Sequence, residues 1–330
     1  MSPFTVTTHT ISASHFRENA RGLNNAYHDV PNLKLVVNRY VPKNRVAQPG
    51  DVSIIFAHAN GFHKELYEAF FADLLVRYPN IRGIWAPDAA HQGASGILNE
   101  PFLGDQPCWT DFARDIVHLI NVFASELPPP LVGVGHSFGG HAIVRASLTN
   151  PSLFAAMVLI DPVIEEWAGH GLVPAKASSK RQDCWPSRQD AEKYFRSRTF
   201  YKQWDPRCLE AHLKHGLRDL PTLAYPDKAG VTLTTSKFQE VCTFLLCEGE
   251  ERVGNHVAPA DTFRKLKELT RPVLYIVGGD SPVSPEWVNK RKLENTPNAE
   301  MVSVPDVGHL IPMEKPAETG GFLKYDEATD

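Results

Sequence analysis

The run GVGHSFGG, residues 133–140, decides how the rest of the sequence is interpreted. An apolar stretch over residues 131–134 precedes it, and residues 142–148 continue it with a helical pattern. The segment Gly135-His136-Ser137-Phe138-Gly139 matches G-x-S-x-G, in which a serine sits on a sharp strand-to-helix turn with its Oγ above a sheet. Glycines flank such a serine because a Cβ would clash in so tight a turn. The motif therefore predicts Ser137 as a nucleophile and the backbone N–H of Phe138 as an oxyanion donor.

The same run supports two other interpretations. From Gly133 to Gly139 it also fits a relaxed dinucleotide-binding fingerprint, and Asp161 follows 22 residues later, close to a ribose-binding position. The glycines could also do no more than tighten a turn. A dinucleotide loop usually follows the first strand of its domain, whereas at least three predicted strands precede this run. That order favours a serine turn after a fifth strand.

Short apolar strands alternate with helical patterns along most of the chain. The alternation predicts an open, mostly parallel sheet with helices on both faces, an α/β fold. It is interrupted over residues 163–257, where aromatic and charged residues follow one another without strand alternation, which predicts a mostly helical insertion. We therefore expect one core made of residues 1–162 and 258–330, with residues 163–257 as a cap over Ser137. The predicted strands cover residues 35–37, 51–58, 81–85, 131–134, 157–160, 272–277 and 300–304, and the predicted core helices cover residues 64–78, 109–127, 142–148, 285–293 and 310 onward.

Composition excludes several classes of protein. The chain has 330 residues, of which 42% are hydrophobic and 22% charged, with a net charge of −4, so neither a disordered chain nor a nucleic-acid-binding protein is indicated. No apolar run is long enough for a bilayer span, and no stable membrane anchor is expected. Five scattered cysteines without a C-x-x-C motif predict neither a disulfide framework nor a zinc site. His212 and His215 lack a third ligand, so we expect no metal and no cofactor.

The ends of the chain bear on the expected compartment. The first 16 residues lack the apolar core of a signal peptide, and the last four, EATD, do not form a peroxisomal signal. With the unpaired cysteines, these features predict a cytoplasmic protein.

A serine nucleophile needs a base and an acid, which in this kind of fold follow it in the order serine, acid, histidine. Asp280 follows the strand predicted at residues 272–277, and His309 follows the strand predicted at residues 300–304. Both lie at carboxyl ends of strands, as Ser137 does, so we expect His309 as general base and Asp280 as the acid that orients it. Asp161, at the end of the strand after the serine turn, is the alternative acid.

A second oxyanion donor is expected from the loop HANGF, residues 58–62. The N–H of Asn60 is the candidate, with Gly61 as the alternative. The residues predicted to contact substrate are Phe62, His136, Trp167 and Trp185.

The order of these motifs resembles the α/β-hydrolase superfamily. The resemblance spans roughly residues 35–325 and includes the loop at residues 88–95, DAAHQGAS, before the serine turn. The N-terminal stretch HTISASHFRE, residues 9–18, is more narrowly similar to fungal lipase-like and toxin-biosynthesis hydrolases. Some relatives of that kind are peroxisomal, and the resemblance implies lipid-ester chemistry or secondary metabolism.

Together these features predict a serine hydrolase that cleaves a carboxylic ester, thioester or lactone of an apolar small molecule through an acyl-enzyme on Ser137. The same residues would serve an acyltransferase or cyclase in which another nucleophile replaces water. A ligand receptor built on the hydrolase scaffold is a third possibility of a different class. The sequence leaves the oligomeric state open.

Overall fold

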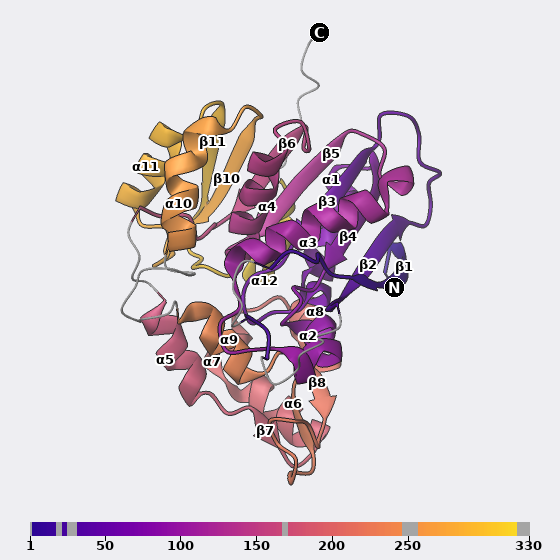
Figure 1. Ribbon diagram of the computed structural model, residues 1–330, viewed down its shortest axis with the longest axis vertical. Helices are drawn as coiled ribbons and strands as arrows, with labels where there is room; N and C mark the ends of the chain where they lie inside the picture. Colours follow the sequence, from indigo (N-terminus) through magenta and orange to yellow (C-terminus); the bar gives the residue numbers. More distant parts are fainter. Residues whose placement is uncertain (1, 18–21, 25–31, 167–170, 246–256, 322–330) are drawn as a thin grey trace.

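A computed structural model gives the fold and describes residues 2–17, 22–24, 32–166, 171–245 and 257–321 (Figure 1). Within these residues, eight strands form one large sheet in the order β1-β2-β4-β3-β5-β6-β10-β11. Strand β2 pairs antiparallel with both of its neighbours, and the pairs from β4 to β11 are parallel. In that order the strands are β1 (Phe4–Ser12), β2 (Lys34–Pro42), β4 (Ile81–Pro87), β3 (Val52–Ala57), β5 (Leu131–His136), β6 (Ala156–Ile160), β10 (Val273–Gly278) and β11 (Ala299–Val304).

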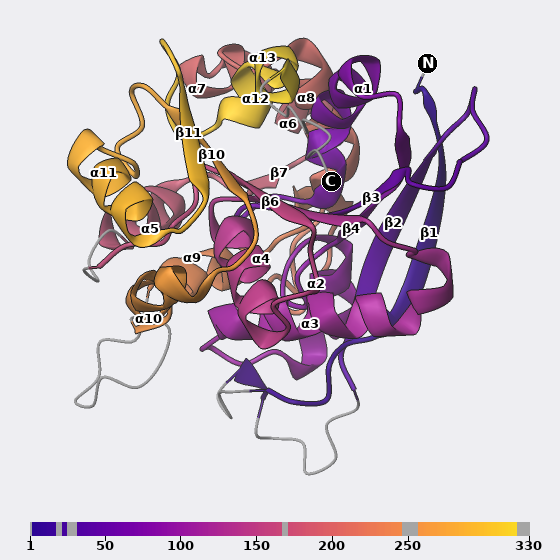
Figure 2. The ribbon, with the colours of Figure 1, turned by 90° about the horizontal axis from the view of Figure 1, so that it is seen from above.

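Helices cover both faces of the sheet, as Figure 2 shows from above. Helices α3 and α4 pack against each other on one face, and α1 and α13 pack together on the other. The predicted mostly parallel α/β sheet is therefore confirmed, whereas β1 was not predicted. The helices of this part are α1 (Glu68–Arg77), α2 (Gly93–Asn99), α3 (Trp109–Val122), α4 (Phe138–Thr149), α10 (Val257–Lys265), α11 (Glu286–Asn295), α12 (Ile311–Glu314) and α13 (Pro316–Gly321).

Apolar side chains form a core on each face of the sheet. On the α3 side, Phe112, Ile116 and Leu119 of α3 are at most 1% exposed and pack with residues of α4. They lie on the helical stripe that the sequence pattern predicts. On the opposite side, Phe70 of α1 and Ile311 of α12 are fully buried. Because the central strands are buried on both faces, they are apolar at nearly every position.

The described residues between β6 and α10 form a separate group of elements at the lower end of the molecule in Figure 1. It is richer in structure than the mostly helical segment expected, because three short strands form a second sheet in the order β7-β9-β8. These strands are too short to give an alternating pattern that can be recognised in the sequence. The elements are α5 (Leu172–Lys180), β7 (Cys184–Trp185), α6 (Arg188–Ser197), α7 (Thr199–Lys202), α8 (Pro206–His215), β8 (Leu217–Asp219), β9 (Val231–Leu233) and α9 (Lys237–Phe244).

This inserted segment is attached to the hydrolase-like core by apolar and backbone contacts. Trp204 packs edge-on against Phe62, with their ring centroids 5.8 Å apart. The N–H of Asp205 donates to the carbonyl of Met313 at 2.7 Å. The insertion leaves the sheet after β6, at the edge formed by the carboxyl ends of the parallel strands, which is where open α/β sheets build their sites.

Candidate active site

Ser137 stands in the turn between β5 and α4, with φ of +55° and ψ of −116°. The turn brings α4 so close to strand β3 that a Cβ on Gly139 would lie 2.1 Å from the carbonyl oxygen of Ala57. A Cβ on Gly135 would lie 2.4 Å from the carbonyl oxygen of Gly139. Both glycines of the motif are thus required by backbone packing. Because neither glycine has a side chain, the backbone of Ser137 can take its strained conformation at the edge of the sheet.

His309 is placed beside this serine by the loop that follows β11. Its Nε2 lies 2.8 Å from Ser137 Oγ, and its Nδ1 lies 2.6 Å from Asp161 Oδ2. With the acid bound at Nδ1, the neutral ring carries its hydrogen there and offers Nε2 as the acceptor for the serine hydroxyl. The three side chains form one continuous hydrogen-bonded chain.

Asp161 follows β6 directly and is fully buried, with φ of +41°. Its Oδ2 also accepts a hydrogen bond from Ser281 Oγ at 2.5 Å. Burial alone raises the pKa of Asp161, but the hydrogen bond and charge of His309 outweigh burial, so the pKa is lowered. The carboxyl group is therefore charged at neutral pH.

The contact expected of Asp280 is made by Asp161 instead. Asp280 is exposed, and it joins the histidine loop through its backbone, donating its N–H to the carbonyl of Val307 at 3.0 Å. Strands β6 and β10 are neighbours in the sheet, so the two candidate acids follow strands that lie side by side. The positive φ of Asp161 and the hydrogen bond from Ser281, the residue after Asp280, decide between them.

The loop after β3 contains a backbone donor at Asn60 that has no partner among the described residues. The N–H of Ala59 donates to Tyr67 Oη at 2.9 Å, and the N–H of Gly61 donates to Gln92 Oε1 at 2.8 Å. Among the described residues, the N–H of Asn60 and the N–H of Phe138 have no hydrogen-bond acceptor. Both residues line the cavity that contains Ser137. This loop geometry favours Asn60 over Gly61 as the second oxyanion donor.

His136 supports this arrangement from behind. It is fully buried, its Nε2 donates to the carbonyl of His309 at 2.9 Å, and its Nδ1 accepts from Tyr67 Oη at 2.9 Å. His136 does not line the cavity, so the structure places it behind the site rather than in its wall. Tyr67 connects the loop at Ala59 to the histidine loop, a role for which the sequence carries no signal.

A cavity of about 720 Å³ opens over Ser137, between the sheet edge and the inserted segment. Phe62, one of the residues expected to contact substrate, lines this cavity. Trp185 does not, because it is 3% exposed and packs inside the insertion against Phe195. Trp167 lies outside the described residues. Further aromatic and apolar side chains complete the wall, among them Trp109, Tyr194, Phe200, Tyr201, Phe244, Val283 and Leu310.

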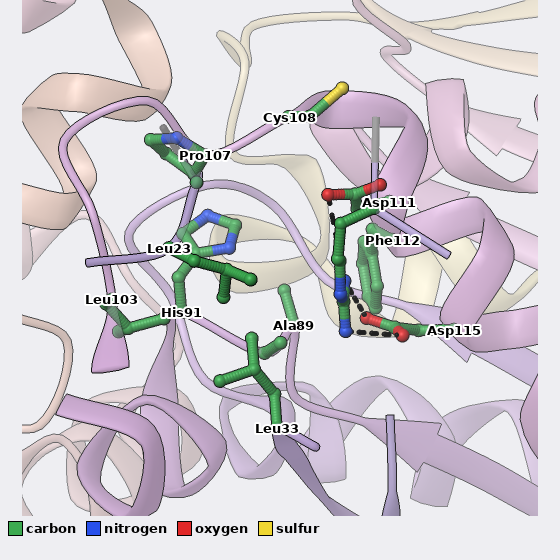
Figure 3. Close-up of a pocket in the computed structure, with 13 residues that line it drawn as sticks. Leu23, Leu33, Ala89, His91, Leu103, Pro107, Cys108, Asp111, Phe112 and Asp115 are labelled. Atoms are coloured by element: carbon green, nitrogen blue, oxygen red, sulfur yellow. Dashed lines mark hydrogen bonds and ion pairs between the residues drawn. The ribbon is translucent and has the colours of Figure 1, made fainter. Parts of the chain in front are cut away.

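A second cavity, shown in Figure 3, lies on the α3 side of the loop that carries His91. Its volume of about 20 Å³ is enough for a water molecule but not for a substrate. The carboxylate of Asp115 closes one side, where it binds Arg17 through two hydrogen bonds of 2.9 and 3.1 Å. The larger cavity is therefore the candidate active site.

Within the described residues, no group of three or more His, Cys, Asp or Glu side chains is placed to hold a metal ion. His212 is buried instead in the insertion, where its ring stacks on that of His63. No helix in the described part of the chain is long and apolar enough to cross a membrane.

Comparison with known proteins agrees with the fold. Residues 54–320 match the model of the alpha/beta hydrolase family, and the chain belongs to this family. A type I acyl-CoA thioesterase of Penicillium brevicompactum is 34% identical over 84% of this chain and 74% of its own length. A type I acyl-CoA thioesterase of Penicillium roqueforti is 33% identical over 94% of this chain and 84% of its own length. The peroxisomal alpha-beta-hydrolase Lpx1 of Saccharomyces cerevisiae superposes with a TM-score of 0.80 over 97% of this chain and 88% of its own, at 20% identity.

The α/β-hydrolase assignment made from the motifs is thereby confirmed. With acyl-CoA thioesterases among its relatives, the chain is an ester-bond hydrolase. The family assignment accounts for the eight-stranded sheet and for the serine turn after β5.

Buried neutral histidines make the fold sensitive to acid. Burial lowers the pKa of His141, on α4 beside Trp109, to about 3. Between about pH 6.5 and 3 the unfolded chain binds a proton at this position and the native chain does not, so stability falls as the pH falls. At pH 5.5, one unit below the unfolded value, we expect His141 to lower the free energy of unfolding by about 1.4 kcal/mol relative to pH 7.5.

The measurement is urea unfolding of the wild type and of His141→Phe at both pH values. The variant should lose about 1.4 kcal/mol less than the wild type over this interval. Identical losses in the two proteins would contradict the neutral, buried state of this histidine.

Proposed function

We propose that the protein hydrolyses a carboxylic ester or thioester through an acyl-enzyme on Ser137. The observation that carries the proposal is the hydrogen-bonded chain from Ser137 through His309 to Asp161 at the floor of a large cavity. The unpartnered N–H groups of Asn60 and Phe138 belong to the same cavity. A nucleophile, a base, an acid and two oxyanion donors thus surround one position.

In the first half-reaction, Ser137 Oγ attacks the substrate carbonyl while His309 Nε2 takes the serine proton. Asp161 keeps the ring in the required tautomer and stabilises the imidazolium. The N–H groups of Asn60 and Phe138 bind the tetrahedral oxyanion, each contributing roughly 2.7–4 kcal/mol to the barrier reduction. His309 returns the proton to the leaving alcohol or thiol. Water then attacks the acyl carbonyl while His309 takes its proton. The bond between the acyl carbon and Ser137 Oγ breaks, His309 returns the proton to Oγ, and the acid leaves.

We propose that residues 163–257 act as a cap that selects the substrate. Within this segment, Tyr194, Phe200 and Tyr201 contribute aromatic wall to the cavity, which suits an apolar acyl group. Lys180 and Arg198 contribute positive charge to the same wall. In the described part of the chain neither cation has an ion-pair partner, and Arg198 instead lies 4.4 Å over the ring of Tyr194.

More specifically, we propose that the substrate is an acyl thioester of coenzyme A. Acyl-CoA thioesterases are among the relatives at 33% and 34% identity. An acyl-CoA has an apolar acyl group on one side of the thioester and phosphate groups on the other. The aromatic wall fits the first part, and the exposed Lys180 and Arg198 provide charges for the second.

The nucleophile is tested by labelling with a fluorophosphonate probe, which reacts with activated serines. We expect the wild type to be labelled and Ser137→Ala to remain unlabelled, because the chemistry requires the Oγ. Ser152→Ala removes an exposed serine outside the site and serves as the control. Labelling that persists in Ser137→Ala would rule out the proposed nucleophile.

The acid is tested by comparing Asp161→Asn with Asp280→Asn in the turnover of a short aryl ester. Loss of the Asp161 charge leaves the imidazolium unstabilised and the tautomer wrong, so kcat should fall by about 10³–10⁴. Asp280→Asn should stay within about twofold of the wild type, since that carboxylate is exposed. A large loss in Asp280→Asn with normal activity in Asp161→Asn would reverse the assignment.

The proposed contact with the coenzyme A part of the substrate is tested with two thioesters of the same acyl group. One is the CoA thioester, and the other is the N-acetylcysteamine thioester, which lacks phosphate. In the double variant Lys180→Ala, Arg198→Ala we expect KM for the CoA thioester to rise about tenfold, as for the loss of charge-assisted hydrogen bonds. KM for the N-acetylcysteamine thioester should not change. Lys202→Ala removes an exposed cation of α7 that does not line the cavity and is the matched control. Equal effects on both substrates would exclude a phosphate contact.

A further inference from the structure

Glu240 is a buried carboxylate on α9 that faces the active-site cavity but touches neither Ser137 nor His309. It is 4% exposed. One carboxylate oxygen accepts from Ser178 Oγ at 2.7 Å, and the other binds the guanidinium of Arg181. Burial by itself lowers the pKa of Arg181, but the charge of Glu240 outweighs it and the pKa is raised. Arg181 therefore keeps its positive charge beside Glu240.

Glu240 also reaches across to the oxyanion loop of the core. Its backbone carbonyl accepts a hydrogen bond from Asn60 Nδ2 at 3.1 Å, between residues 180 positions apart in sequence. Its side chain occupies the space beside Gly61, where a Cβ would lie 2.7 Å from the carboxylate carbon of Glu240. Gly61 has φ of +82°, so this position requires a glycine both for conformation and for space.

The opposite side of the same loop is held by Gln92, which is fully buried in the core. Its Oε1 accepts from the N–H of Gly61 at 2.8 Å, and its Nε2 donates to Asn60 Oδ1 at 2.6 Å. The side-chain amide of Asn60 is thus held from the core by Gln92 and from the cap by Glu240. These two contacts restrain the side chain of the same residue whose backbone N–H has no acceptor among the described residues.

We propose that Glu240, through its ion pair with Arg181, is a positioning residue that sets the Asn60 N–H for the oxyanion and so makes acylation depend on a seated cap. The inference rests on the proposed function, because it assigns a use to the oxyanion donor of that reaction. Oxyanion stabilisation requires donors fixed before charge develops, since a donor that must reorganise loses most of its effect. The cap then contributes to kcat as well as to substrate selection.

A purely structural role for Glu240 makes different predictions. If the residue only completed the cavity wall, its loss would weaken the binding of substrate and of inhibitors alike. A residue that positions an oxyanion donor affects the tetrahedral state and leaves ground-state binding largely unchanged. Two measurements distinguish a structural role from a positioning role. The first is whether a variant changes kcat or KM, and the second is its affinity for an inhibitor that forms a tetrahedral adduct with the serine.

The principal variant is Glu240→Gln, which keeps the shape and an acceptor for Ser178 but removes the charge opposite Arg181. We expect kcat to fall by about 10- to 100-fold with KM within about twofold, and the inhibition constant of a trifluoromethyl ketone to rise by the same factor as kcat falls. Inhibition by the matching alcohol, which forms no adduct, should not change. In the double variant Arg181→Met, Glu240→Gln the losses should be smaller than the product of the single effects, because no unpaired charge remains.

Glu210→Gln is the matched control, since Glu210 pairs with Arg196 at the exposed surface of the cap. Gly61→Ala tests the same contact from the core side while leaving Glu240 and Arg181 in place. Because the added Cβ would displace the Glu240 carboxylate, it should reproduce the loss in kcat and in ketone affinity. It also keeps the inference testable if Glu240→Gln fails to fold.

Hydrogen exchange of the peptide spanning residues 59–63 gives a readout that does not depend on catalysis. We expect faster exchange there in Glu240→Gln and Gly61→Ala, and wild-type exchange in Glu210→Gln. Unchanged exchange and unchanged kcat in both variants, or a rise in KM with kcat and ketone affinity unaltered, would overturn the inference. If exchange responds but Ser137→Ala retains full activity, the proposed function fails and the contact between cap and loop stands.

Discussion

The close packing of helix α4 against strands β3 and β5 is the constraint on which the site depends. With Gly135 and Gly139 in contact with backbone, the chain turns so sharply that Ser137 takes a positive φ and stands beyond the sheet edge. The same contact brings the N–H of Phe138 and the loop after β3 into one cavity. A methyl group at either glycine would have to separate strand from helix. The position of Ser137, and with it every other feature of the proposed chemistry, therefore depends on this packing.

The ends of three further strands supply the other residues of the candidate site. The loops after β3, β6 and β11 deliver Asn60, Asp161 and His309 to the same edge, because parallel strands end on one side of the sheet. Buried polar side chains then connect these loops. His136 and Tyr67 join the histidine loop to Ala59, and hydrogen bonds made inside the protein are favoured there because burial removes the competing water.

The inserted segment completes the site from the other side. Its elements supply most of the wall of the 720 Å³ cavity, and its Glu240 contacts the loop that carries Asn60. Because this segment contributes both wall and loop contacts, we propose that it both selects the substrate and influences the reaction. Gly61, wedged between Gln92 of the core and Glu240 of the insertion, is where the two parts meet.

Much of the fold and several site residues were determined by sequence alone, because they depend on local patterns. Apolar strands alternating with helical stripes predicted the sheet, and the glycines around Ser137 predicted the turn, because the spacing G-x-S-x-G can be recognised within five consecutive residues. Contacts between distant residues required the tertiary structure. Asp161 and Asp280 follow neighbouring strands, and only the direction of each side chain in space decides that Asp161 meets His309. The same holds for Trp185, which is buried inside the insertion, and for Glu240, whose contact with Asn60 spans 180 positions, because burial and hydrogen bonding depend on neighbours in space rather than in sequence.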